Sequence, residues 1–125
     1  MLQVSAPFHC SLMQPAQDAL APVLEAIPFS PAKIPVVVNV DARLVTDAPE
    51  LRDALIRQVT GAVRWTESMQ LLIAHGVTTF VEVGPGKVLS GLVRRIDRSA
   101  SCYALEDPES VAAAVAATAS GEVHV

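Results

Sequence analysis

A histidine close to the start of the sequence, His9, is the residue whose type and position best suit acid–base chemistry. It lies where an extended segment meets the expected start of a helix, a junction at which side chains often face a cleft. Imidazole gains and loses its proton near neutral pH, so it can serve as a general base. A histidine held in packing by hydrogen bonds fits the same position. The spacing alone leaves both interpretations open.

Gln58 offers this histidine a partner. The last four carbonyl groups of a helix have no donor within the helix, and Gln58 falls in the final turn of the helix expected over residues 47–59. Its main-chain oxygen can accept the proton of one imidazole nitrogen. That bond would fix the tautomer and leave the other nitrogen free as a base. An ordinary exposed glutamine is the alternative.

The turn Gly84-Pro85-Gly86, followed by Lys87, precedes an expected helix. Backbone N–H groups at such a helix start can bind an anion. The G-x-x-x-x-G-K-[ST] spacing of a P-loop is absent, so nucleotide binding has no support. A tight connection between a strand and a helix is the competing interpretation.

A nucleophile for the base is missing from the sequence. No serine has glycine at both the −2 and +2 positions, so there is no G-x-S-x-G elbow. Cys10 adjoins His9, but adjacent side chains point in different directions and make a poor thiolate–imidazolium pair. Cys102, beside Tyr103 in an expected strand, should be buried and unreactive. The two cysteines also form no metal-binding pattern with the three histidines.

The elements that must position these residues alternate between strand and helix. Helices are expected over residues 11–27, 47–59, 65–75, 87–96 and 108–119, and strands over residues 2–6, 34–40, 78–83 and 101–105. The continuous apolar run IPVVVNV (34–40) is typical of a buried parallel strand. This alternation predicts an α/β fold, with a parallel sheet and flanking helices.

Helix starts carry their own signals. Ser11 with Gln14 has the spacing of a capping box, and so does Asp47 with Glu50. Pro49 falls in the first turn of the second helix, where proline is tolerated. Pro22 removes a hydrogen bond inside the first helix, so we expect a kink there, not a stop.

Composition excludes several classes of function. Although 51% of residues are hydrophobic, no run approaches the roughly 18 apolar residues that cross a bilayer. A formal charge of −4 argues against a nucleic-acid partner. The start of the sequence lacks the pattern of a secretory signal, and free thiols suit a reducing compartment. We therefore expect a cytoplasmic protein with no nucleic-acid or membrane partner and no metal or other cofactor.

Five blocks of the sequence, in a fixed order, resemble one family. They are VSAPFHC (4–10), PVVVNVDA (35–42), RDALIRQV (52–59), VRWTES (63–68) and VEVGPGKVLSGL (81–92). In order and spacing, from about Leu2 to Ala117, they resemble bacterial malonyl-CoA:acyl carrier protein transacylase. An acyltransferase domain of a polyketide synthase fits less well, because those domains usually differ around the last block.

The resemblance implies a role for each matching residue. His9 takes the place of the catalytic base, and Gln58 takes the place of the glutamine whose main-chain carbonyl orients it. Gly84 and Gly86 fall on the active-site side of the sheet, as structural residues and candidate substrate-binding residues.

The resemblance also implies a domain organisation. Residues 1–8 would be the final strand of a small ferredoxin-like subdomain, and residues 9–119 the C-terminal portion of the hydrolase-like large α/β subdomain of an acyltransferase. Residues 120–125 would be a disordered tail. The family's serine elbow, oxyanion-hole donors and malonyl-binding arginine have no counterpart here. We therefore expect a C-terminal fragment whose partner is the missing N-terminal half.

The implied reaction moves a malonyl group from CoA to the phosphopantetheine thiol of acyl carrier protein in fatty acid biosynthesis. Its partners would be malonyl-CoA and acyl carrier protein, and the isolated chain should be inactive. One alternative is a non-catalytic module that binds acyl carrier protein or CoA through Arg94, Arg95 and the glycine-rich turn. Another is a thiol enzyme that uses Cys10 with His9.

Overall fold

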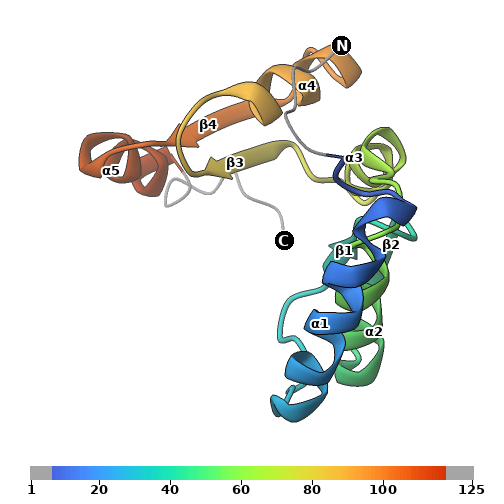
Figure 1. The fold of residues 1–125 in the computed structure, drawn as a ribbon. Helices are drawn as coiled ribbons and strands as arrows, with labels where there is room; N and C mark the ends of the chain where they lie inside the picture. Colours follow the sequence, from blue (N-terminus) through green and yellow to red (C-terminus); the bar gives the residue numbers. More distant parts are fainter. Residues whose placement is uncertain (1–6, 118–125) are drawn as a thin grey trace. The chain divides into compact units, whose positions relative to one another are not determined.

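The computed structural model describes residues 7–117. The chain divides into two compact units, Met1–Ser68 and Met69–Val125. Figure 1 labels the elements of each unit in chain order. The strand expected over residues 2–6 and the tail 120–125 lie outside the described residues.

The first unit consists of two helices and a β-hairpin. A 3₁₀ turn, η1 (Ser11–Met13), leads into helix α1 (Gln14–Ala26), which packs against helix α2 (Ala48–Arg57). Strands β1 (Val36–Val38) and β2 (Arg43–Val45) form the hairpin, and β1 contacts α2. The small core lies between hairpin and helix; its members are Val38, Val45 and Ala54, with Val40 and Leu51 packed against them.

The expected buried parallel strand over residues 34–40 is wrong. Only three of those residues are in a strand, and β1 pairs antiparallel with β2, an element that the sequence did not predict. The chain reverses at Ala42, which has a φ of 51° and donates its N–H to Val38 O. In the described residues α2 covers one side of the hairpin, so Ile34 and Val36 stay 69% and 44% exposed.

The two predicted capping boxes have different outcomes. At α2, Asp47 Oδ1 accepts a hydrogen bond from the N–H of Glu50 at 3.0 Å, which confirms the prediction. The box at Ser11 is wrong, because Ser11 begins a 3₁₀ turn and the Gln14 side chain donates to Asp18 instead. Helix α1 runs through Pro22 to Ala26, so the proline does not stop it.

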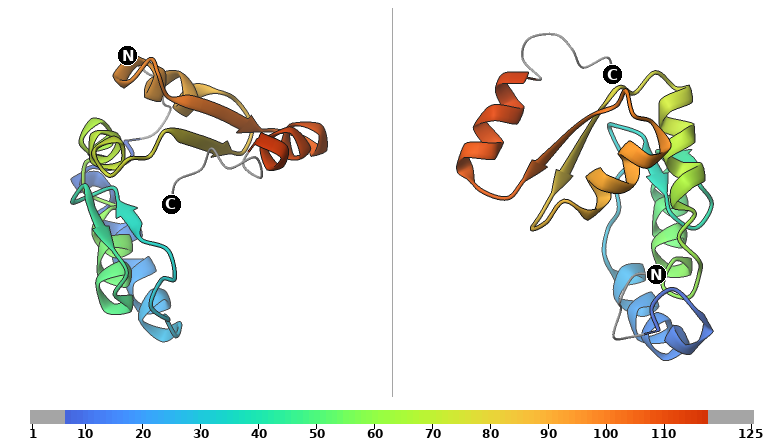
Figure 2. Two further views of the ribbon diagram at one scale, coloured as in Figure 1. Left: turned by 180° about the vertical axis from the view of Figure 1, so that it is seen from behind. Right: turned by 90° about the horizontal axis from the view of Figure 1, so that it is seen from above.

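The second unit is built on a strand–helix–strand motif. Helix α3 (Trp65–Ala74) spans the boundary between the units and is followed by β3 (Thr79–Val83), α4 (Val88–Ile96), β4 (Ser101–Leu105) and α5 (Pro108–Ala117). Strands β3 and β4 are parallel, with Thr79 opposite Ser101. Helix α4 contacts both strands and α5 contacts β4 (Figure 2). This motif confirms the α/β class and the parallel pairing.

The helices do not cover the whole of this sheet. In the described residues the sheet has two strands, and Val81 and Val83 of β3 are 42% and 80% exposed. Parallel strands are usually covered on both faces. In the described residues this sheet departs from that rule, because side chains of β3 stay exposed. Among residues 7–117 no helix combines the length and the apolar character needed to span a membrane.

Candidate active site

His9 and Gln58, which are 49 positions apart in the sequence, are joined by a hydrogen bond in the first unit. His9 Nδ1 lies 2.8 Å from the main-chain oxygen of Gln58. A carbonyl oxygen can only accept, so Nδ1 must carry the proton of this bond. In the neutral imidazole, Nε2 then keeps its lone pair and can take a proton.

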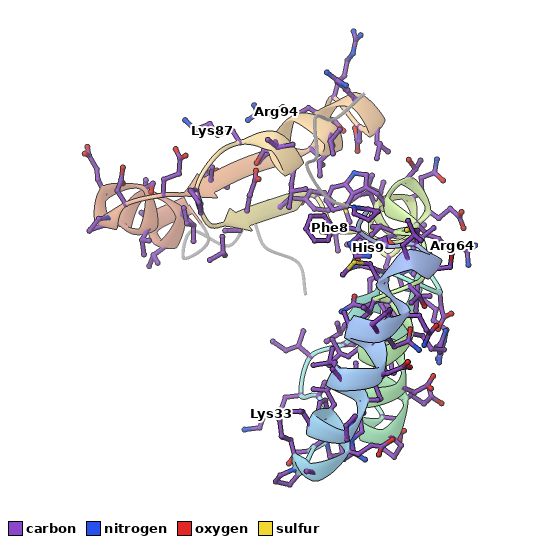
Figure 3. The ribbon with its side chains drawn as sticks, viewed as in Figure 1. Phe8, His9, Lys33, Arg64, Lys87 and Arg94 are labelled. Atoms are coloured by element: carbon purple, nitrogen blue, oxygen red, sulfur yellow. The ribbon has the colours of Figure 1, made fainter. Side chains whose placement is uncertain are left out.

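The backbone of His9 is in an unusual conformation. Its φ is 57°, in the left-handed region that few residues other than glycine adopt, although histidine is enriched there. The residue is exposed and lies two positions before η1, next to the cap residue Cys10 (Figure 3). Such a conformation persists only where its surroundings hold it, and it often occurs at functional sites. The bond to Gln58 is one contact that holds it.

Gln58 is the C-terminal cap of α2, and its position follows from the end of that helix. Its own N–H donates to Ala54 O at 3.0 Å, and the neighbouring carbonyls of Ile56 and Arg57 accept from Val59 and Gly61. The carbonyl of Gln58 is directed to the imidazole instead. The end of the helix therefore presents one backbone acceptor to His9, as expected from the unpaired carbonyls of a helix terminus.

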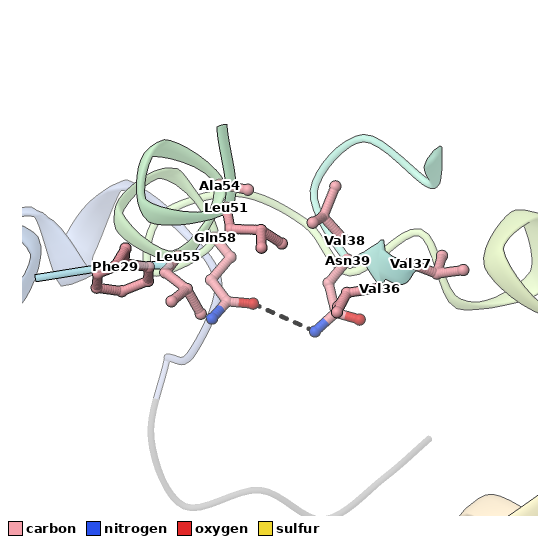
Figure 4. A pocket seen from close by; sticks show the side chains of 9 residues that line it. All are labelled: Phe29, Val36, Val37, Val38, Asn39, Leu51, Ala54, Leu55 and Gln58. Atoms are coloured by element: carbon pink, nitrogen blue, oxygen red, sulfur yellow. Dashed lines mark hydrogen bonds between the residues drawn. The ribbon is translucent and has the colours of Figure 1, made fainter. Parts of the chain in front are cut away.

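The side chain of Gln58 lines an open cavity of about 440 Å³ within the first unit. The other lining residues are Phe29, Val36, Val37, Val38, Asn39, Leu51, Ala54 and Leu55. Figure 4 shows the apolar side chains together with two amides, Asn39 and Gln58, which are joined by a hydrogen bond of 3.3 Å. Gln58 thus contacts the imidazole through its backbone and the cavity through its side chain.

An arginine beside Gln58 is the centre of an ion-pair network. Arg57 Nη1 and Nη2 donate to the two carboxylate oxygens of Asp41 at 2.9 and 2.7 Å, and its Nε donates to Asp53 at 2.6 Å. Hydrogen bonding to Arg57 lowers the pKa of the Asp41 carboxyl and raises the pKa of the guanidinium. Both groups therefore stay charged and are unsuited to proton transfer near neutral pH.

The backbone N–H groups of the turn at residues 84–86 have partners within the chain. Gly84 N–H lies 3.3 Å from Leu105 O, and Gly86 N–H donates to a carboxylate oxygen of Glu106 at 2.7 Å. The φ values of 133° and 93° explain why both positions are glycine. These contacts support a structural role, while binding of substrate by Gly84 and Gly86 stays a prediction.

The N-terminus of α4 is also occupied. The Glu82 carboxylate accepts the N–H groups of Leu89 and Ser90 at 3.0 and 2.8 Å. These bonds lower the pKa of Glu82, with the contribution of Ser90 the largest. A carboxylate of the chain itself therefore fills the place that an external anion would take at this helix start.

The other reactive side chains contact backbone carbonyls. Cys10 Sγ donates to Pro7 O at 3.0 Å, which gives its proton a partner other than the imidazole. Arg94 Nη2 donates to Cys102 O at 3.2 Å. His75, directly after α3, repeats the geometry of His9 locally, with Nδ1 2.8 Å from Leu71 O four residues earlier. The described residues contain no cluster of three or more His, Cys, Asp or Glu side chains that could hold a metal ion.

The sequence did not predict the roles of Asn39, Asp41 and Arg57. All three lie in the blocks PVVVNVDA and RDALIRQV, but their pairing depends on the hairpin between β1 and β2, which was not predicted. The one feature of the sequence that pointed to a role for Arg57 is its position directly before Gln58.

Comparison with known proteins shows similarity to part of one kind of enzyme. No family model matches the sequence. The malonyl CoA-acyl carrier protein transacylase of Bacillus subtilis is 46% identical over 114 residues, which make up 91% of this chain and 36% of the relative. Among solved structures, an acyl carrier protein S-malonyltransferase from Vibrio cholerae has a TM-score of 0.82 at 46% identity, and the match covers 90% of this chain and 37% of that one.

A second solved structure is a malonyl-transacylase in complex with an acyl carrier protein of a type II polyketide synthase. It has a TM-score of 0.84 at 45% identity, and the match covers 93% of this chain and 38% of that one. The fold and sequence therefore match part of an acyltransferase that acts on acyl carrier protein. The chain is homologous to malonyl-CoA:acyl carrier protein transacylase and spans about a third of the length of the relatives it matches.

Proposed function

We propose that this chain is the part of a malonyl-CoA:acyl carrier protein transacylase that supplies the general base. The observation that carries the proposal is the bond of 2.8 Å between His9 Nδ1 and Gln58 O. This bond leaves Nε2 as the basic nitrogen and fixes the plane of the ring. A carboxylate has the same orienting role beside the histidine of serine hydrolases.

Two proton transfers through His9 account for the reaction. In the first half, Nε2 takes the proton of a serine hydroxyl as the oxygen attacks the thioester carbonyl of malonyl-CoA. The carbon–sulfur bond breaks, and the departing CoA thiolate takes that proton. In the second half, Nε2 takes the thiol proton of phosphopantetheine as the sulfur attacks the malonyl-serine ester, and the serine oxygen recovers it. Base catalysis of this kind contributes about 10²–10⁴ in rate.

The serine belongs to a segment that this sequence does not contain, because no serine here has the G-x-S-x-G context. The complete site would therefore combine this chain with the remaining part of the transacylase. An acyl carrier protein is the proposed acceptor, which the complex of the solved relative supports.

The experiment compares the isolated chain with a chimera in which it replaces the matching third of the Bacillus subtilis enzyme. With labelled malonyl-CoA, the isolated chain should form no acyl adduct, because it offers no activated hydroxyl. The chimera should transfer malonate to acyl carrier protein. Stoichiometric acylation of the isolated chain, or a folded chimera without transfer, would overturn the proposal.

Polyketide synthesis is the second candidate for the pathway. The complex of a relative with a type II polyketide synthase carrier protein favours it. Assay of the chimera with carrier proteins of both pathways separates the two, because the preferred acceptor should show the higher kcat/KM. A non-catalytic binding module has less support, since Arg94 and the N–H of Gly86 already have partners within the chain.

A further inference from the structure

The loop between β1 and β2 is attached to the last turn of α2 by a two-point ion pair. Arg57 Nη1 donates to Asp41 Oδ1 at 2.9 Å, and Arg57 Nη2 donates to Asp41 Oδ2 at 2.7 Å. A paired contact of this kind fixes orientation as well as distance, because the guanidinium and the carboxylate are both planar. The two side chains are partly buried, with 39% and 27% of their surface exposed. Arg57 is the residue directly before Gln58.

A second attachment joins the same loop to Gln58 itself. Asn39 Nδ2 donates to Gln58 Oε1 at 3.3 Å. The loop is in turn held by Arg64, whose backbone N–H donates to Asn39 O and whose Nη1 donates to Asp41 O, both at 2.9 Å. The loop is therefore fastened on one side to α2 and on the other to the start of α3.

These attachments meet at the residue whose carbonyl must point at His9. The last turn of a helix frays easily, because its carbonyls lack partners within the helix. Gln58 is the cap residue, with φ −65° and ψ −19°, so a small rotation of its peptide would turn the oxygen away from Nδ1. Anchoring Arg57 and the side chain of Gln58, the two residues that lead into that peptide, limits the rotation.

We infer that Asn39, Asp41 and Arg57 form a positioning bracket, a set of side chains that holds the end of α2 so that the Gln58 carbonyl fixes the tautomer of His9. The inference rests on the proposed function and deepens it. None of the three touches a reacting atom. Asp41 acts through Arg57, and Arg57 acts through the backbone that it shares with Gln58.

The main test is Asp41→Asn in the chimera and in the isolated chain. Asparagine has the same size as aspartate, but its amide is uncharged. It cannot form the charged two-point contact with the guanidinium of Arg57. We expect kcat to fall about 10- to 100-fold, as for a misplaced catalytic group, with KM little changed. In the isolated chain, ¹H–¹⁵N spectra of the His9 ring should show a lower population of the Nδ1–H tautomer. A variant that is only less stable would shift its melting temperature without changing this tautomer below the transition.

Asp53→Asn is the matched control, because it removes the other carboxylate bonded to Arg57 and leaves the paired contact with Asp41 intact. It should change neither kcat nor the tautomer appreciably. Arg57→Lys keeps the positive charge and loses the two-point geometry, so it should behave like Asp41→Asn. It also provides the test if Asp41→Asn does not fold.

Equal losses for the two aspartate variants, or an unchanged tautomer in folded Asp41→Asn and Arg57→Lys, would overturn the bracket. The proposed function fails by a different result, namely a chimera in which His9→Ala keeps full activity. In that case the tautomer spectra of the isolated chain still decide whether the bracket orients His9.

Discussion

The His9→Ala chimera is expected to lose about 10²–10⁴ of the kcat for malonyl transfer. Without the imidazole, neither the serine hydroxyl nor the phosphopantetheine thiol has a positioned base, so both halves of the reaction slow. Malonyl-CoA should still bind, because His9 is not proposed to hold the malonyl carboxylate or the CoA nucleotide. Steady-state transfer to acyl carrier protein measures the loss, and single-turnover acylation of the serine shows whether the first half is affected.

His75→Ala is the matched control. This imidazole is also exposed and makes the same type of bond, from Nδ1 to a carbonyl at 2.8 Å, but its partner Leu71 lies only four residues earlier, in the last turn of α3. Its removal should leave kcat nearly unchanged. Similar losses for both variants would show that removal of an exposed histidine disturbs the enzyme in general, and an active His9→Ala variant would remove the proposed base.

Replacement of Gly61 by alanine should lower the free energy of unfolding by about 1–3 kcal/mol. A β-carbon at this position would lie 2.7 Å from Val40 Cγ2 and 3.0 Å from Arg57 O, both closer than normal packing allows. Valine is stiff at its first side-chain torsion, and the carbonyl belongs to the end of α2. The backbone must therefore shift beside Gln58. Chemical denaturation followed by circular dichroism measures the change.

Gly91→Ala is the control for that prediction and should have the opposite sign. Gly91 lies inside α4, and apart from its two chain neighbours and the nearby backbone of its own helix no atom of the described residues lies within 4 Å of the place where its β-carbon would be. Alanine at a helix interior position is favoured over glycine by about 0.5–1 kcal/mol. If Gly61→Ala proved neutral or stabilising, the close packing of Val40 against the end of α2 would be contradicted.

Local chemistry explains what the sequence predicted well. The Asp47 cap of α2 depends only on residues within one turn. The parallel pairing of β3 with β4 follows from the strand–helix–strand pattern, because a helix that connects two neighbouring strands of one sheet brings the chain back in the same direction. The contact of His9 with Gln58 was also within reach, because a helix end always leaves carbonyls without partners. Its catalytic role stays a prediction.

The hairpin of the first unit could not be predicted in the same way. A continuous apolar run has no alternation that tells one face of a strand from the other, so residues 34–40 fit a buried strand equally well. The reversal that follows uses Ala42 at a positive φ, where glycine or asparagine would have signalled a turn. The pairing of Asp41 with Arg57 depends on that reversal, which explains why the bracket was missed.

The protonation of the His9 ring is the most direct test of a base oriented by the Gln58 carbonyl. Two-bond ¹H–¹⁵N correlation spectra of the isolated chain, recorded above the pH at which the ring is charged, distinguish the two neutral tautomers. Donation from Nδ1 to Gln58 O predicts a proton held on Nδ1 and an unprotonated Nε2. A ring that carries its proton on Nε2, or that averages between both forms as a free imidazole does, would contradict it.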